Sequence, residues 1–188
     1  MRILITGTSG GVGGAVKKAA LAEGHVVAAV NRADFEDLRG KLMELAAPID
    51  AVIFCTGMCP VKPVALTSDE LIAETLRVNC SLFLKLMRTI IAEKLYNSAG
   101  MKALAVSSVS ATEGWPGGAA YCASKGALSA MCRAMAVELQ PKQISVKCLE
   151  PRYIKTKMFD LGAGRMGVPE TAAISPDAFA AQVMKELT

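Results

Sequence analysis

Short apolar runs alternate with longer, helix-like segments along the whole chain. The apolar runs predict strands at residues 2–5, 26–30, 51–55, 102–107 and 145–149. The segments between and after them predict helices at residues 12–23, 34–45, 68–94, 121–139 and 177–187. Strands that alternate with helices are typical of an α/β protein. Because right-handed crossovers carry each helix back over the sheet, we expect an open, doubly wound parallel sheet.

Composition supports a single globular domain over residues 1–188. Hydrophobic residues make up 52% of the chain and charged residues 20%, a balance that suits strands buried on both faces. The net charge is +4 with no basic run, so we expect no nucleic-acid partner. No uncharged apolar stretch approaches about 18 residues, so we expect no membrane span and a cytoplasmic protein. Six cysteines without metal-ligand spacing and a single histidine predict free thiols and no metal.

A glycine-rich segment, Thr6-Gly7-Thr8-Ser9-Gly10-Gly11-Val12-Gly13, follows the first predicted strand directly and opens the first predicted helix. In this context glycines permit a tight turn, backbone approach to a pyrophosphate and close helix–strand packing. The N–H groups at the start of the helix attract phosphates. The segment therefore predicts a dinucleotide site, against the alternative of a glycine-rich turn without a ligand.

The residues after the second predicted strand are Asn31 and Arg32. A carboxylate at this place would bind the ribose hydroxyls of NAD, whereas a guanidinium can pair with a 2′-phosphate. We therefore expect NADP(H) rather than NAD(H), unless Arg32 is only a solvated surface residue.

Tyr121 and Lys125 are four residues apart in the fourth predicted helix, so they share a face. An ammonium beside a phenol lowers the pKa of the phenol and prepares it for acid–base chemistry. Ser108 follows a predicted strand, thirteen residues before Tyr121. Asn79 lies inside a long apolar helical segment, where an amide is unfavourable without a specific role.

Taken in order, the glycine motif, Asn79, Ser108 and Tyr121-x-x-x-Lys125 resemble the classical short-chain dehydrogenase/reductase family, of which this would be an unusually short member. The resemblance runs from residue 1 to about residue 156 and implies a Rossmann-like sheet. It also implies that Tyr121 exchanges a proton with a carbonyl or alcohol oxygen, that Ser108 orients this oxygen, and that Lys125 holds the nicotinamide ribose and lowers the Tyr121 pKa. Asn79 would hold a water in a proton relay.

The same resemblance implies a set of cofactor contacts that follows the carboxyl ends of the strands. These residues are Gly7, Thr8, Ser9, Gly11, Val12, Asn31, Arg32, Asp34, Cys55, Thr56, Gly57, Tyr121, Lys125, Pro151, Ile154 and Thr156.

The chain departs from the family pattern at several places. Phe54-Cys55-Thr56-Gly57 replaces an Asn-Asn-Ala-Gly segment, and Arg152 replaces the glycine of a Pro-Gly pair. Arg152 could recognise an anionic substrate or point to solvent. The second and third strands of the family are compressed here, and its last strand is missing.

We therefore expect an NADPH-dependent oxidoreductase that acts on a small carbonyl or alcohol substrate. The alternatives are an epimerase or dehydratase with the same Tyr/Lys chemistry, and a catalytically silent NADPH-binding sensor or scaffold. A homodimer through the helices predicted at 68–94 and 121–139 is a further expectation.

Overall fold

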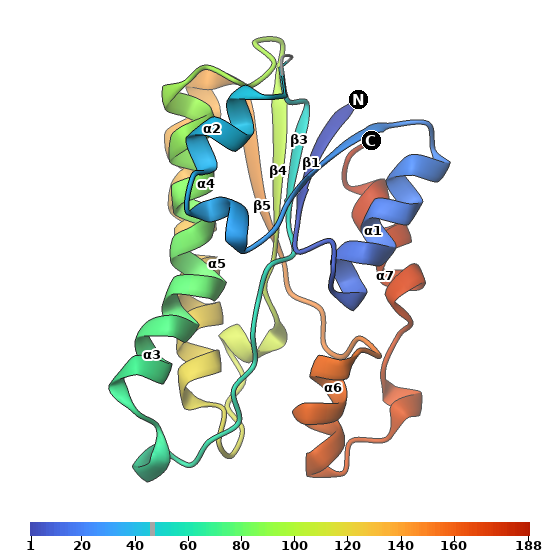
Figure 1. Cartoon of the computed structure of the whole chain (residues 1–188). Coiled ribbons are helices and arrows are strands. Elements are labelled where there is room, and N and C mark those ends of the chain that lie inside the picture. Colours follow the sequence, from blue (N-terminus) through green and yellow to red (C-terminus); the bar gives the residue numbers. More distant parts are fainter. Residues whose placement is uncertain (46–47) are drawn as a thin grey trace.

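A five-stranded parallel sheet with helices on both faces forms the centre of the molecule (Figure 1). The computed structural model describes residues 1–45 and 48–188. The strand order is β2-β1-β3-β4-β5. The strands are β1 Arg2–Thr6, β2 Val26–Val30, β3 Ala51–Phe54, β4 Met101–Val106 and β5 Ile144–Leu149. This arrangement confirms the Rossmann-like sheet, and no further strand of the sheet follows β5 in the part of the chain that the structure describes.

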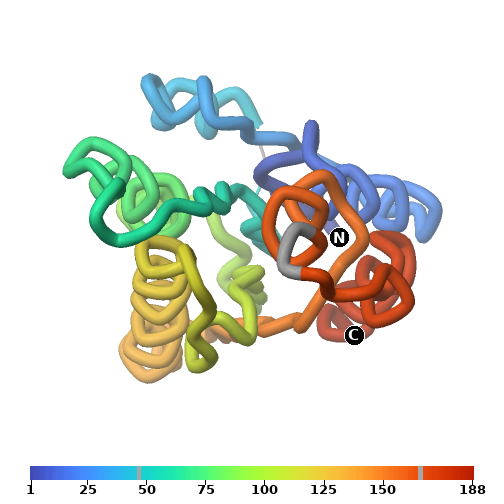
Figure 2. The backbone as a smooth tube through the Cα atoms, turned by 90° about the horizontal axis from the view of Figure 1, so that it is seen from below, coloured from blue at the N-terminus to red at the C-terminus, as the bar shows by residue number. Residues whose placement is uncertain are grey.

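Helices cover both faces of the sheet and form two layers (Figure 1). The first layer contains α1 Gly11–Ala22 and α7 Pro176–Lys185. The second contains α2 Leu38–Met43, α3 Asp69–Leu76, α4 Leu82–Ala92 and α5 Ala119–Leu139. Figure 2 shows the two layers from the carboxyl ends of the strands, with α6 Lys157–Leu161 at that end. Within the described residues, no helix has both the length and the apolar character needed to cross a bilayer.

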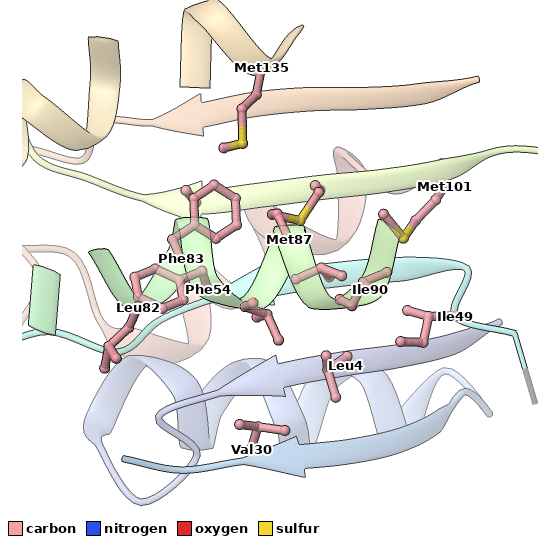
Figure 3. Close-up of a cluster of buried hydrophobic side chains, with 14 of the residues drawn as sticks. Leu4, Val30, Ile49, Phe54, Leu82, Phe83, Met87, Ile90, Met101 and Met135 are labelled. Atoms are coloured by element: carbon pink, nitrogen blue, oxygen red, sulfur yellow. The ribbon is translucent and has the colours of Figure 1, made fainter. Parts of the chain in front are cut away.

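Alternation along the strands divides the buried side chains between two cores. Ile3 and Ile5 face α1 and α7, whereas Leu4 faces the helices of the other layer, because successive strand residues point to opposite faces. The larger core includes Phe54 and Phe83, whose ring centroids lie 5.1 Å apart (Figure 3). Each side chain buried in this way stabilises the fold by about 1.5–3 kcal/mol relative to exposure.

The chain reverses its direction across the sheet between β1 and β3. The first crossover leads from β1 to its neighbour β2, and the next returns past β1 to β3. Because both crossovers are right-handed, α1 and α2 lie on opposite faces (Figure 1). The loops that follow β1 and β3 therefore separate, which opens a crevice at the carboxyl ends of the strands.

Two predicted helices differ in detail from those in the structure. The segment predicted as one helix over 34–45 is a 3-10 turn, Ala33–Phe35, followed by the short α2. The Asp37 carboxylate accepts the Gly40 N–H at 3.1 Å, and this capping bond starts a new helix at that point. The helix predicted over 68–94 consists of α3, a π-helical turn at Arg77–Ser81 and α4.

Gly13 permits the close approach of α1 to the end of β1. A Cβ atom at Gly13 would lie 2.7 Å from the Gly7 carbonyl carbon, whereas a Cβ atom at Gly14 would lie 3.4 Å from the nearest atom, the Thr8 carbonyl oxygen. We expect Gly13→Ala to lower the free energy of unfolding by about 2 kcal/mol, since the helix must move away from the strand. Gly14→Ala should leave this energy unchanged or raise it by up to about 1 kcal/mol. Urea denaturation of both variants tests this, and equal effects would contradict it.

Candidate active site

A cavity of about 710 Å³ lies at the carboxyl ends of the strands. One end is formed by the glycine-rich segment after β1. Gly7 adopts φ +67°, and a Cβ atom there would lie 3.0 Å from the Thr56 nitrogen, so this turn requires glycine. Gly10 is the N-cap of α1 and offers no side chain to cap it. Gly11, Val12 and Gly13 line the cavity, which places the positive end of the helix dipole there.

The end of β3 forms the floor of this region. The Thr6 hydroxyl oxygen accepts the N–H groups of Cys55 and Thr56, both at 3.1 Å, and so ties β3 to β1. Thr56 is buried and lines the cavity. Its Oγ1 is the one buried side-chain polar atom without a hydrogen-bond partner within the described residues, a state that usually indicates a ligand or an ordered water.

The corner after β2 presents the Arg32 guanidinium at the cavity and holds the Asp34 carboxylate in a backbone hydrogen bond. Arg32 is exposed and lines the cavity together with Asn31. Asp34 accepts the Asn31 N–H at 2.7 Å, and Thr8 donates to the Asn31 side-chain oxygen at 3.3 Å. Asp34 and Thr8 are not among the described residues that line the cavity. They hold the turn that presents Asn31 and Arg32.

Helix α5 places Tyr121 and Lys125 at the other end of the cavity. Both side chains are nearly buried, at 8% and 5% exposure. The Lys125 Nζ atom lies 5.7 Å from the centre of the Tyr121 ring and donates to the Val106 carbonyl oxygen at 2.8 Å. The end of β4 therefore fixes the ammonium beside the phenol.

The pKa values of this pair are dominated by burial. Burial lowers the pKa of Lys125 to about 8, because a buried ammonium loses its hydration. Burial also raises the pKa of Tyr121 above its usual value, and the nearby Ser108 hydroxyl acts in the opposite direction. Desolvation exceeds the other contributions to the Tyr121 pKa and favours the protonated phenol, so the expectation that Lys125 lowers this pKa stays a prediction.

Asn79 lies in the π-helical turn and connects three segments. Its Oδ1 accepts the Met58 N–H at 2.7 Å, and its Nδ2 donates to the Met58 carbonyl oxygen and to the Ser124 hydroxyl, both at 2.8 Å. These bonds explain a fully buried amide in an apolar helix. A Cβ atom at Gly57 would lie 3.4 Å from Asn79 Oδ1 and 3.7 Å from Lys125 Nζ, so both polar groups surround the loop after β3. The water relay stays a prediction.

The wall between Ser108 and Tyr121 is aromatic. Trp115 donates from its indole nitrogen to the Ser110 hydroxyl at 3.1 Å, and its ring centroid lies 6.2 Å from that of Tyr121. Tyr153 and Phe159 also line the cavity and pack edge-on, with ring centroids 6.0 Å apart. This half of the cavity has the apolar surface that a small organic substrate requires.

The Arg152 side chain is 58% exposed, and its guanidinium is paired beside the cavity. Its guanidinium makes a bidentate ion pair with Glu113, with Nη2 to Oε1 at 2.6 Å and Nη1 to Oε2 at 3.2 Å. Glu113 was absent from the residues predicted from sequence. The two residues are 39 positions apart, and no local pattern connects them.

The structure brings most of the predicted residues to this one cavity. Those that line it are Gly7, Ser9, Gly11, Val12, Asn31, Arg32, Cys55, Thr56, Gly57, Ser108, Tyr121, Lys125, Pro151, Ile154 and Thr156. Asn79 lies behind the lining, in contact with the loop after β3. Lining residues that sequence reasoning did not assign to the site include Cys59, Glu113, Tyr153 and Met158.

Comparison with known proteins identifies the family. A model described as short chain dehydrogenase matches residues 30–163, more than half of the chain. The 3-oxoacyl-(acyl-carrier-protein) reductase FabG of Rickettsia conorii is 26% identical over 90% of this chain and 85% of its own length. Carbonyl reductase (NADPH) 2 of Sus scrofa is 25% identical over 84% of this chain and 73% of its own length. The chain therefore belongs to the short-chain dehydrogenase family.

Solved structures show the same fold. A short chain dehydrogenase family protein from Francisella tularensis superposes with a TM-score of 0.84 at 19% identity, covering 100% of this chain and 90% of that one. The 3-ketoacyl-(acyl-carrier-protein) reductase from Brucella melitensis, complexed with NADH, has a TM-score of 0.83 at 21% identity with the same coverage.

The depressed pKa of Lys125 predicts a pH-dependent stability. Its pKa is about 8 in the fold, against an ordinary value of 10.5. Between these values the unfolded chain binds more protons, so the contribution of Lys125 to stability rises with pH. We expect the free energy of unfolding of the wild type, relative to Lys125→Met, to increase from pH 8 to pH 10 with a slope of at most about 1.4 kcal/mol per pH unit. Chemical denaturation across this range measures it; parallel curves for the two proteins would contradict it.

Proposed function

We propose that this chain is an oxidoreductase that transfers a hydride between NADP(H) and the carbonyl or alcohol group of a small molecule, with Tyr121 as general acid and base. One observation carries the proposal: a single cavity joins a glycine-rich helix N-terminus and Arg32 to the buried pair of Tyr121 and Lys125. Membership of the short-chain dehydrogenase family supports the reaction class.

The residues present fit a dinucleotide. The turn at Gly7 and the close contact at Gly13 leave room for a pyrophosphate beside the start of α1. The partnerless Thr56 hydroxyl would meet a polar group of the adenosine half. Pro151, Ile154 and Thr156 would lie along the nicotinamide half. When bound, the nicotinamide supplies or accepts the hydride.

Arg32 is the residue on which the preference for NADPH rests. It is exposed at the cavity, and the nearby Asp34 carboxylate is bonded to the Asn31 backbone. A guanidinium at this place suits a 2′-phosphate, and the Glu74 carboxylate, whose pKa Arg32 helps to lower, is itself paired with Arg77. The comparisons name both cofactors, NADPH in the Sus scrofa enzyme and NADH in the Brucella complex, so the preference depends on this residue.

The proton chemistry follows from the buried groups. Burial keeps Tyr121 protonated, the form that can donate to a carbonyl oxygen during reduction. Ser108 Oγ accepts the Ser110 N–H at 3.1 Å, which leaves the Ser108 hydroxyl proton for the same substrate oxygen. Lys125 donates one N–H to the Val106 carbonyl oxygen, and its other N–H groups can donate to ribose hydroxyls. Asn79 acts as a positioning residue for the loop beside them.

Cofactor choice can be measured by titrating the purified protein with NADPH and NADH while following reduced-nicotinamide fluorescence. We expect NADPH to bind at least tenfold more tightly, and Arg32→Ala to remove most of this difference, since it deletes the phosphate contact. Arg88 is the matched control, because it lines the neighbouring groove with Arg32 but not the cavity. Preference for NADH, or equal losses in Arg32→Ala and Arg88→Ala, would overturn the assignment.

The role of Tyr121 can be measured by turnover of a panel of ketones and aldehydes. We expect Tyr121→Phe to lower kcat by about 10²–10⁴-fold, the range of general acid catalysis, with little change in the Kd for NADPH. Tyr96→Phe is the control, since Tyr96 is outside the cavity lining. Equal rates in wild type and Tyr121→Phe would exclude this residue as the acid. NADPH binding without any turnover would favour a silent cofactor-binding protein.

A further inference from the structure

Two loops at the substrate end of the cavity each contribute one charged side chain. Glu113 follows the 3-10 turn Val109–Ala111, and Arg152 follows β5. The Val109 N–H donates to the Pro151 carbonyl oxygen at 3.2 Å, so the two loops are joined by a backbone bond a few residues from the ion pair. Both side chains line the cavity.

The guanidinium is committed to Glu113. Two parallel contacts, at 2.6 and 3.2 Å, join the two groups, the geometry of the stronger Arg–carboxylate pairs. Among the described residues that line the cavity, Glu113 carries the one carboxylate. A free carboxylate that approaches Arg152 must therefore compete with an acid already held on the same scaffold, whose effective concentration is high, and is also repelled by its charge.

The pair is about half exposed, and Lys125, the buried cation of the same cavity, already donates to the Val106 carbonyl oxygen. The neighbouring walls are formed by Trp115, Tyr153, Met158 and Phe159, and Lys157 is exposed. The neutralised pair and these walls suit a substrate with an uncharged group beside its carbonyl.

We infer that Glu113 is a specificity-determining residue: by neutralising Arg152 it makes the site select uncharged carbonyl substrates, such as ketones, keto esters and keto thioesters, over the corresponding carboxylates. This inference rests on the proposed function for its substrate class. It goes beyond that function by assigning the selection to one ion pair, and it predicts that removing Glu113 converts Arg152 into a carboxylate-binding residue.

The turnover test compares a β-keto ester with the matching β-keto acid, each with NADPH. We expect the wild type to prefer the ester in kcat/KM by at least tenfold. Glu113→Gln should raise kcat/KM for the acid about tenfold, a size typical of one charge-assisted contact, so that the ester-to-acid ratio falls. The double variant Glu113→Gln/Arg152→Gln should lose this gain. A wild type that prefers the acid, or an unchanged ratio in Glu113→Gln, would overturn the inference.

Glu170→Gln is the matched control. Glu170 pairs with Lys155, both residues are exposed, and neither lines the cavity. Breaking this pair frees a cation of similar exposure outside the site, so the ester-to-acid ratio should not change. A fall in the ratio equal to that of Glu113→Gln would mean that overall charge, and not the pair in the cavity, controls selection. Because exposed ion pairs contribute little to folding, all these variants should fold.

A binding readout separates this inference from the proposed function. Trp115 is the single tryptophan of the chain and lines the cavity beside Glu113, so its fluorescence reports on ligands there without turnover. We expect malonate to bind Glu113→Gln about tenfold more tightly than the wild type, and the gain to disappear in the double variant. Equal malonate affinity in all three proteins would overturn the inference even if ketone reduction is observed. If malonate affinity rises as expected but no substrate is turned over, the role of the Glu113–Arg152 pair is supported and the proposed reaction is contradicted.

Discussion

A side chain at Gly13 would collide with the carbonyl group of Gly7, and the absence of that side chain sets the distance between α1 and the end of β1. This contact permits the tight turn and directs the first N–H groups of the helix into the cavity. The Thr6 hydroxyl then joins β1 to β3 through the N–H groups of Cys55 and Thr56. The chain changes its direction across the sheet between β1 and β3, and this change opens the crevice. The close contact of Gly13 with Gly7 makes one end of the crevice suitable for phosphates.

At the other end, burial controls the electrostatics. Lys125 is tied to the Val106 carbonyl oxygen and Tyr121 lies under the wall formed by Trp115. Desolvation disfavours both charged forms, so the protein alone holds a neutral phenol beside an ammonium with a depressed pKa. In the proposed reaction Tyr121 of this pair would donate the proton, and Asn79 holds the loop beside it through bonds to Met58.

The chain departs from the family pattern at the edges of the sheet and at the substrate end of the cavity, whereas Ser108, Tyr121 and Lys125 follow that pattern. The sheet has five strands, with β2 and β5 at its edges, and Arg152 stands where a glycine was expected. Its charge is balanced by Glu113 from another loop. A large cation can therefore border the substrate end of the cavity without offering a free charge to a substrate carboxylate.

The sequence by itself determined the strands, the order of the helices and the residues with chemical character. Strand burial, turn glycines and the four-residue spacing of Tyr121 and Lys125 depend on local geometry, which a linear pattern records. Helical periodicity does not predict the interruption of the helix at Asp37, because this interruption depends on a single capping hydrogen bond to Gly40.

Only the tertiary structure decided the environment of those residues. The pKa of Tyr121 depends on how completely the fold removes water, and the reason for Asn79 depends on Met58 and Ser124, which are 21 and 45 residues away along the chain. The pairing of the Arg152 guanidinium depends on Glu113, which is 39 residues away along the chain. Desolvation and pairing between distant segments arise only when the chain is packed, so no pattern of neighbouring residues contains them.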